Sequence, residues 1–117
     1  MTRKTPQDIL PKELKNWLEG ELFEPVLIDV REKEELAIAS LNHQVLHLPL
    51  SDYSNWINCY SNNLSFDERL VVICHSGIRS WEFGIWLLEQ DSRYQVWNLK
   101  GGIDAWSQDV DNSIPRY

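Results

Sequence analysis

Short, unbroken apolar runs are the feature of this sequence that most limits its fold. The run VLIDV at 26–30 is interrupted by one acid, and the run LVVI at 70–73 by none. Runs of this length without alternation are typical of strands that are buried on both faces, as in a parallel sheet. Segments 45–48 and 95–99 predict two further strands.

Helical patterns separate these apolar runs. Pro11 suits a first helical position and Gly20 a stop, which predicts a helix over 11–19. Further helices are expected over 32–39, within 50–58, over 103–107, and after residue 77, where Ile78, Trp81, Ile85 and Leu88 would share one face. The polar segment 59–65 is expected to be a surface loop. The alternation predicts an α/β fold with an open, mostly parallel sheet flanked by helices on both faces.

Length and charge restrict what the chain can be. Its 117 residues fit one domain, 1–117. An apolar content of 43% with six Trp excludes a disordered chain. The net charge of -7 argues against nucleic acid and anionic membranes as partners, because phosphate groups would be repelled.

Targeting and cysteine usage favour a cytoplasmic setting. No stretch approaches the roughly 20 apolar residues that a membrane span needs. The N-terminal segment MTRKTPQDIL lacks the apolar run of a secretory signal. With only Cys59 and Cys74, no disulfide framework is expected, and a reducing compartment is the natural location.

Cys74 occupies the most informative position in the chain. It follows the buried run 70–73 and precedes a short loop and a helix, so it is expected at the carboxyl edge of the sheet. Unpaired N–H groups at the helix start would stabilise a thiolate and lower the thiol pKa below about 8.5. Gly77 would let the loop amides turn inward, and Arg79 would add a cation. The alternative is a buried structural thiol, which Gly77, Arg79 and the following helix together disfavour.

Several motifs together resemble those of rhodanese-like sulfurtransferases. The loop VVICHSGIRS at 71–80 is similar to that family's active-site loop, and further similarities are LIDVRE at 27–32, VLHLPL at 45–50 and GGIDAW at 101–106. They cover about residues 9–110 in the family's order, which leaves a tail over 111–117. The ending VDNSIPRY also resembles the tail of rhodanese modules joined to sulfur-carrier adenylating enzymes.

The resemblance implies a sulfurtransferase that carries sulfane sulfur from a donor such as thiosulfate to a nucleophilic acceptor as a Cys74 persulfide. Substrate or anion binding would fall to the loop residues His75, Ser76, Gly77, Ile78 and Arg79. No metal or organic cofactor is needed for this chemistry. The partner of such an enzyme would be a small sulfur-containing donor. In the alternative, this chain is a non-catalytic or weakly catalytic persulfide carrier or binding module, and its partner is a desulfurase or a sulfur-carrier protein. Phosphatase or arsenate chemistry ranks last, because Cys74 and Arg79 enclose four residues where phosphatase relatives have five.

Other polar residues have two interpretations each. Asp29 and Arg31 either support the loop from the neighbouring strand or form an ordinary structural ion pair, for instance Arg31 with Glu34 or Glu35. His75 either meets the thiolate or substrate or is a solvated loop residue. His43 and His47 are four residues apart and flank a predicted strand rather than lying on a helix, with no further ligands beside them, so no metal site is expected. Cys59 lies in polar sequence and is expected to be a plain exposed thiol rather than a partner of Cys74.

Overall fold

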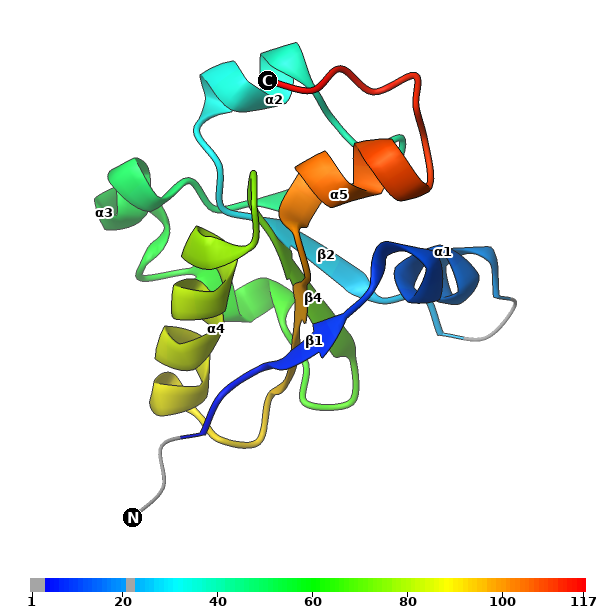
Figure 1. Cartoon of the computed structure of the whole chain (residues 1–117). Helices are drawn as coiled ribbons and strands as arrows, with labels where there is room; N and C mark the ends of the chain where they lie inside the picture. The colour runs from blue at the N-terminus through cyan, green and yellow to red at the C-terminus, as the bar shows by residue number, and fades with distance from the viewer. Residues whose placement is uncertain (1–3, 21–22) are drawn as a thin grey trace.

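The computed structural model describes residues 4–20 and 23–117 (Figure 1). Residues 1–3 of the N-terminal segment MTRKTPQDIL, in which no secretory signal is predicted, lie outside this part of the chain. The described residues include one five-stranded sheet, with strands β1 Gln7–Ile9, β2 Val26–Asp29, β3 Leu46–His47, β4 Arg69–Ile73 and β5 Gln95–Leu99. Its strand order is β1-β5-β4-β2-β3, and each neighbouring pair is parallel. The predicted α/β class is confirmed.

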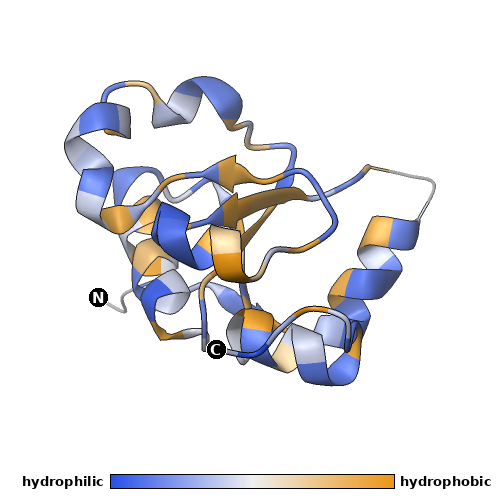
Figure 2. Cartoon of the chain, turned by 90° about the horizontal axis from the view of Figure 1, so that it is seen from above, coloured by the Kyte–Doolittle hydropathy of each residue, from blue (hydrophilic) through white to orange (hydrophobic). Residues whose placement is uncertain are grey.

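Helices cover both faces of the sheet (Figure 1). They are α1 Pro11–Glu19, α2 Lys33–Ile38, α3 Tyr53–Trp56, α4 Ile78–Gln90 and α5 Gly102–Asp109, with 3-10 turns at Leu50–Asp52 and Tyr60–Asn63. Helices α1 and α5 pack together on one face, and α4 lies on the other. Viewed from above, the strands are hydrophobic and much of the helical surface is hydrophilic (Figure 2).

Each face of the sheet has its own apolar core. On the α4 side, Val72 of β4 packs with Phe83 and Leu87 of α4. On the α1 and α5 side, Val71 and Ile73 pack with residues of those helices, including Leu14 and Trp106. Residues 70–73 of β4 are therefore buried on both faces, which is why this run is uniformly apolar.

Two elements differ from the prediction. Strand β1 was not expected, because only three residues lie between Pro6 and Leu10-Pro11 and just one of them, Ile9, is buried. It adds to the sheet edge by pairing with β5, a position that demands little apolar sequence. Ile78 does not share the buried face of α4: it is 71% exposed, whereas Ile85 and Leu88 are buried as expected.

The first turn of α5 holds the loop that follows β4. The amides of Ile103 and Asp104 donate hydrogen bonds to the carbonyls of Cys74 and His75, at 2.9 and 3.1 Å. Gly102 makes this approach possible, since a Cβ atom there would lie 2.4 Å from the His75 carbonyl oxygen. The GGIDAW segment thus fixes the loop of interest from a distant part of the sequence.

Over residues 4–20 and 23–117, no helix combines the length and apolar content needed to cross a bilayer.

Replacing Gly102 by Ala is expected to destabilise the fold. The new Cβ would collide with two loop carbonyls, and the φ of 62° is one that side chains rarely adopt. We expect a loss of roughly 2 kcal/mol or more in the free energy of unfolding, measured by urea titration. Gly20→Ala is the control, because its Cβ would make ordinary contacts, and its effect should stay within about 1 kcal/mol. Equal losses in the two variants would contradict the role given to Gly102.

Candidate functional site

The Cys74 loop connects the central strand to α4. Cys74 directly follows β4, and α4 begins four residues later at Ile78. Gly77 caps the helix with a φ of 97°, and a Cβ there would approach the Gly101 nitrogen to 3.1 Å. Because Gly77 takes this left-handed conformation, the chain turns back so that its own amide faces the cysteine sulfur.

Two polar groups contact the sulfur of Cys74. The Gly77 amide donates to Sγ at 3.1 Å, and the Ser80 hydroxyl oxygen lies 3.2 Å from Sγ. Ser80 also donates to Oδ1 of Asn98, whose Nδ2 in turn donates to Asp8 Oδ1 and the Gly77 carbonyl. Both partners of Nδ2 are acceptors, which fixes the amide orientation and commits the Ser80 hydrogen to Asn98. In this arrangement, the thiol hydrogen is directed at Ser80.

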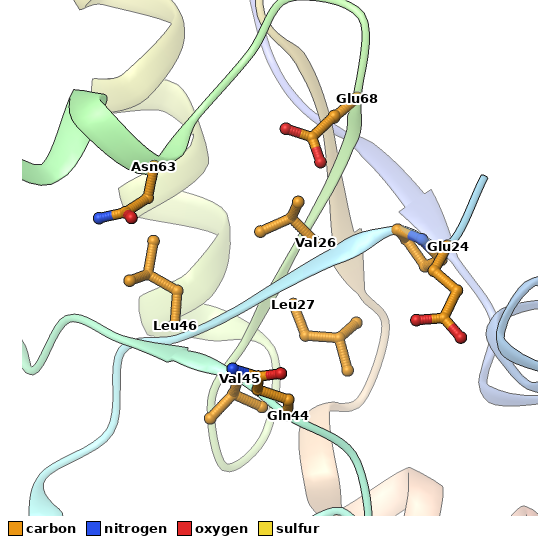
Figure 3. Close-up of a pocket in the computed structure, with 9 residues that line it drawn as sticks. Glu24, Val26, Leu27, Gln44, Val45, Leu46, Asn63 and Glu68 are labelled. Carbon is orange, nitrogen blue, oxygen red and sulfur yellow. The ribbon is translucent and has the colours of Figure 1, made fainter.

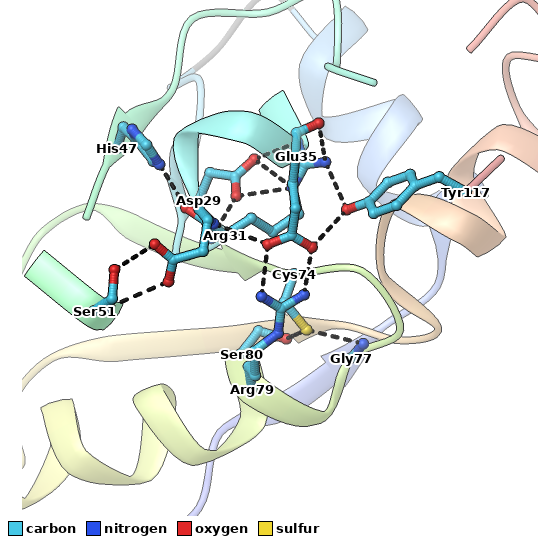
Figure 4. A network of polar contacts seen from close by, with 11 residues as sticks. Asp29, Arg31, Glu35, His47, Ser51, Cys74, Gly77, Arg79, Ser80 and Tyr117 are labelled. Carbon is cyan, nitrogen blue, oxygen red and sulfur yellow. Dashed lines mark hydrogen bonds and ion pairs between the residues drawn. The ribbon is translucent and has the colours of Figure 1, made fainter. Parts of the chain in front are cut away.

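Cys74 is 1% exposed. In the view of Figure 4, the Arg79 guanidinium lies between the sulfur and the carboxylate of Glu35. A reagent therefore reaches the sulfur only when the side chains around it move.

Arg79 forms a two-pronged ion pair with Glu35 of α2. Its Nη1 and Nη2 donate to the two carboxylate oxygens at 2.8 and 2.9 Å. These hydrogen bonds hold the pKa of Glu35 at about 2, even though burial opposes the charge, and they raise the pKa of Arg79. A local contact also positions Glu35 for this pair. Its carboxylate accepts a hydrogen bond from the Glu32 amide in a capping box, which holds the Glu35 side chain at the start of α2.

Tyr117 joins this ion pair to a second one. Its hydroxyl accepts from Arg31 Nη1 and donates to Glu35 Oε1, both at 3.0 Å. Its ring stacks on His75 with centroids 4.1 Å apart and planes 12° apart. Burial raises the Tyr117 pKa, so this hydroxyl keeps its hydrogen at neutral pH. Figure 1 shows the last residues running beside α2, which brings Tyr117 to the loop.

Asp29 and Arg31 form the second pair, which is fully buried. The Arg31 amide and Nε donate to Asp29 Oδ1, and Nη2 donates to Oδ2 at 2.9 Å. Burial alone would lower the pKa of Arg31, but the bonds to Asp29 and Tyr117 outweigh it and raise that pKa. The partner suggested from sequence, Glu34 or Glu35, is wrong for the ion pair: Arg31 reaches the Glu35 backbone carbonyl instead.

The structure thus brings most of the predicted residues together. Arg79 of the Cys74 loop connects to Arg31 through Glu35 and Tyr117 (Figure 4), and His75 joins this group by stacking on Tyr117. Ser76 and Ile78 are exposed on the outside of the loop.

Sequence reasoning missed four contributors, namely Glu35, Ser80, Asn98 and Tyr117. Glu35 was named only as a possible partner of Arg31, and the Glu-x-x-Glu spacing of a capping box was the available signal. Ser80 stands next to Arg79 in the loop motif, while nothing local marks Asn98 or Tyr117.

The remaining candidates are His43, His47 and Cys59. His47 Nε2 donates to the Arg31 carbonyl oxygen at 2.6 Å, and His43 is exposed. Cys59 is an exposed free thiol, as expected. In the part of the chain that the structure describes, no group of three or more His, Cys, Asp or Glu is placed to hold a metal ion.

An apolar pocket of about 440 Å³ adjoins the loop. It shares Ile78 and Arg79 with the loop, and its walls are aromatic and aliphatic, including Leu50, Trp56 and Trp86. A second hollow, of about 380 Å³, lies at the opposite end of the sheet, where β2 begins (Figure 3). Among the described residues that line the second hollow there is no Cys, His, Lys or Arg, and its titratable side chains are Glu24 and Glu68.

Comparisons with known proteins agree on one family. The family model of the rhodanese-like domain matches residues 10–109. The chain is 37% identical over 117 residues to the rhodanese-like/PpiC domain-containing protein 12, chloroplastic, of Arabidopsis thaliana, covering 98% of this chain and 38% of that protein. It therefore spans well under half the length of that relative.

Two further relatives match over most of their length. A protein of Allochromatium vinosum named sulfurtransferase is 31% identical over 83 residues, which cover 71% of this chain and 72% of that protein. The crystal structure of a rhodanese-like domain protein from Staphylococcus aureus superposes with a TM-score of 0.71 at 25% identity, covering 95% of this chain and 98% of that one.

The Glu35–Arg79 pair predicts a specific acid sensitivity. The folded-state pKa of Glu35, about 2, lies below the ordinary value of 4.5, so between these values the unfolded chain binds more protons. The stabilisation is complete above pH 4.5 and is lost as the pH falls towards 2. Glu35→Gln should therefore cost most stability above pH 4.5, and its difference from the unmodified chain should shrink on acidification, as followed by urea unfolding at each pH.

Arg79→Met provides the matched variant, because it removes the partner and leaves the carboxylate. Its stability difference should shrink over the same pH interval. Differences that stay constant from pH 6 to about 3 in both variants would show that the pair contributes nothing to stability.

Proposed function

The chain belongs to the rhodanese-like domain family, and on that premise we propose that it transfers sulfane sulfur through a persulfide on Cys74. The observation that supports this most is the position of Cys74 at the carboxyl end of the central strand, with the Gly77 amide and Ser80 on its sulfur. Arg79 lies beside it at the start of α4. This arrangement offers hydrogen bonds and a nearby cation to a sulfur that becomes negatively charged.

The proposed reaction has two half-steps. The Cys74 thiolate attacks the outer sulfur of a donor such as thiosulfate; an S–S bond forms to Sγ, the donor S–S bond breaks, and sulfite leaves with the electron pair. An acceptor nucleophile then attacks the outer sulfur of the persulfide, takes that sulfur, and returns Cys74 as a thiolate. In each step one bond to the transferred sulfur forms as another breaks, and the combined oxidation state of the two reactants does not change. No external oxidant or reductant is therefore needed.

The loop residues have distinct proposed roles. The Gly77 amide stabilises the charge on Sγ, and Ser80 can turn its hydrogen from Asn98 to a thiolate. Arg79 offers its charge to the outer sulfur or to the leaving group. His75 and Ser76 form the outer part of the loop, where a donor approaches. The Asp29–Arg31 pair supports Glu35 indirectly, because Arg31 donates to the Tyr117 hydroxyl, which in turn donates to Glu35.

The second candidate is a persulfide carrier that serves a protein partner, such as a desulfurase or a sulfur-carrier protein. It is favoured by the apolar pocket beside the loop and by Ile78, which is 71% exposed next to Cys74. Exposed apolar surface next to a reactive group is typical of protein interaction sites. We further propose a reducing, cytoplasmic type of environment, in which both free thiols would persist.

Sulfur loading tests the proposal directly. Incubation of the reduced chain with thiosulfate, and separately with an organic persulfide, should add the mass of one sulfur atom in intact-protein mass spectrometry. Cys74→Ser should abolish this addition because it removes the nucleophile. Cys59→Ser is the control and should load like the unmodified chain. If neither donor ever loads the protein, or if Cys74→Ser still loads, the persulfide proposal fails.

Turnover separates the enzyme from the carrier. With thiosulfate and cyanide, an enzyme should form thiocyanate over many cycles per Cys74, because small molecules complete both half-steps. A carrier should load once and release its sulfur quickly only to a protein acceptor. Thiocyanate formation is measured under steady-state conditions, and its absence from a chain that loads fully would favour the carrier.

A further inference from the structure

We infer that Glu35 determines the donor class of this site: by neutralising Arg79, it disfavours compact dianions such as thiosulfate and favours sulfane sulfur on an uncharged organic carrier. This inference rests on the proposed persulfide function and names the substrate class for the same sulfur. Glu35 would act as a specificity-determining residue through Arg79, without touching the reacting atoms.

The geometry of the ion pair is the first reason. Both terminal nitrogens of Arg79 are bonded to the Glu35 carboxylate, at 2.8 and 2.9 Å. These are the nitrogens that would form a two-pronged contact with an oxyanion such as the sulfonate part of thiosulfate. An incoming dianion must therefore displace Glu35 from these nitrogens or approach a guanidinium whose charge Glu35 already compensates, whereas a donor without an oxyanion leaves the pair intact.

The second reason is that Glu35 is held in place on several sides. The Tyr117 hydroxyl donates to its Oε1, and Glu35 Oε2 accepts from the Glu32 amide. The Glu35 side chain is only 19% exposed, against 37% for Arg79, so water solvates the released carboxylate poorly. Displacing Glu35 would break these contacts as well as the ion pair.

Two other arginines of the protein are already engaged in ion pairs. Arg31 is paired with Asp29 inside the protein, and Arg116 is paired with Asp104, near His75. The chain as a whole carries a net charge of -7. This negative charge disfavours the approach of a dianionic donor to the protein.

The wall next to Arg79 suits an organic carrier. The pocket that shares Ile78 and Arg79 is lined by apolar and aromatic side chains, including Tyr53, Trp56 and Phe83. A carbon skeleton can lie against such a surface, whereas a sulfite leaving group gains nothing from it.

The organic donor reacts with the same bond changes. The Cys74 thiolate attacks the outer sulfur of R–S–SH and forms a new S–S bond. The donor S–S bond breaks and R–S⁻ leaves with the electron pair. The thiolate product carries one charge, where thiosulfate would release a dianion.

A donor comparison tests the inference. The rate constant of sulfur addition to Cys74 is measured by mass spectrometry with thiosulfate and with the persulfide of N-acetylcysteinamide, whose carrier is uncharged. Glu35→Gln should raise the thiosulfate rate constant about tenfold, because no carboxylate then compensates the charge of Arg79, and change the organic persulfide rate constant less than about threefold. Gln can keep the capping box. The thiosulfate gain should shrink as salt is raised from about 0.05 to 0.5 M.

Glu34→Gln is the matched control. It removes the same charge from the exposed neighbouring position of α2 and should leave both rate constants nearly unchanged. Tyr117→Phe retains the ring on His75 and should give a smaller thiosulfate gain than Glu35→Gln.

The outcomes separate the two levels of the argument. If the unmodified chain is loaded by neither donor, the proposed function itself fails. If it is loaded by the organic persulfide while Glu35→Gln brings no thiosulfate gain, the function stands and the inference is overturned. An equal gain in Glu34→Gln would also overturn it, since net charge rather than the pairing of Arg79 would then be the cause. Equal losses with both donors in Glu35→Gln would show a purely structural role.

Discussion

The hydrogen bonds from the first turn of α5 to the carbonyls of Cys74 and His75 are the interaction on which the rest of the site depends. They tie the loop after β4 to the turn after β5, so two neighbouring parallel strands end in one rigid unit. Because those carbonyls are fixed, the Gly77 amide faces the sulfur and α4 starts in line with it. Gly102, the first residue of α5, is small enough for this contact, which explains why a glycine stands at this position.

A chain of polar contacts then links the interior of the sheet to the surface of the loop. It starts at the buried Asp29–Arg31 pair, passes through the Tyr117 hydroxyl, and ends at the Glu35–Arg79 pair beside Cys74. A buried charge pair stabilises a fold only when its remaining hydrogen bonds are satisfied, and Tyr117 satisfies one of them at each end. The group is thus better regarded as one network than as two separate ion pairs.

The sequence predicted those parts of the molecule that local patterns specify. The apolar runs of β2 and β4 and the loop from Cys74 to Ser80 could be recognised because each lies within ten residues. Strand β1 could not, since it is held mainly by pairing with β5, about ninety positions later. The partner of Arg79 could not be predicted either: Glu35 and Tyr117 are 44 and 38 residues away from it and meet only through the fold. A contact between distant segments leaves no mark on periodicity or spacing.

An arginine that is already paired has a physical advantage next to a reactive thiol. A free guanidinium in such a place would bind whatever inorganic oxyanion is abundant, and the sulfur would then stand behind an occupied anion site. A carboxylate anchored in the same protein competes with those anions at an effective concentration in the millimolar range or above, because it needs no encounter. Glu35 is anchored in this way by α2 and Tyr117. The pairing of Arg79 with Glu35 lowers the affinity of the site for every small anion, whether or not that anion is a sulfur donor. Selectivity therefore shifts towards donors that the protein recognises through the organic group that carries their sulfur.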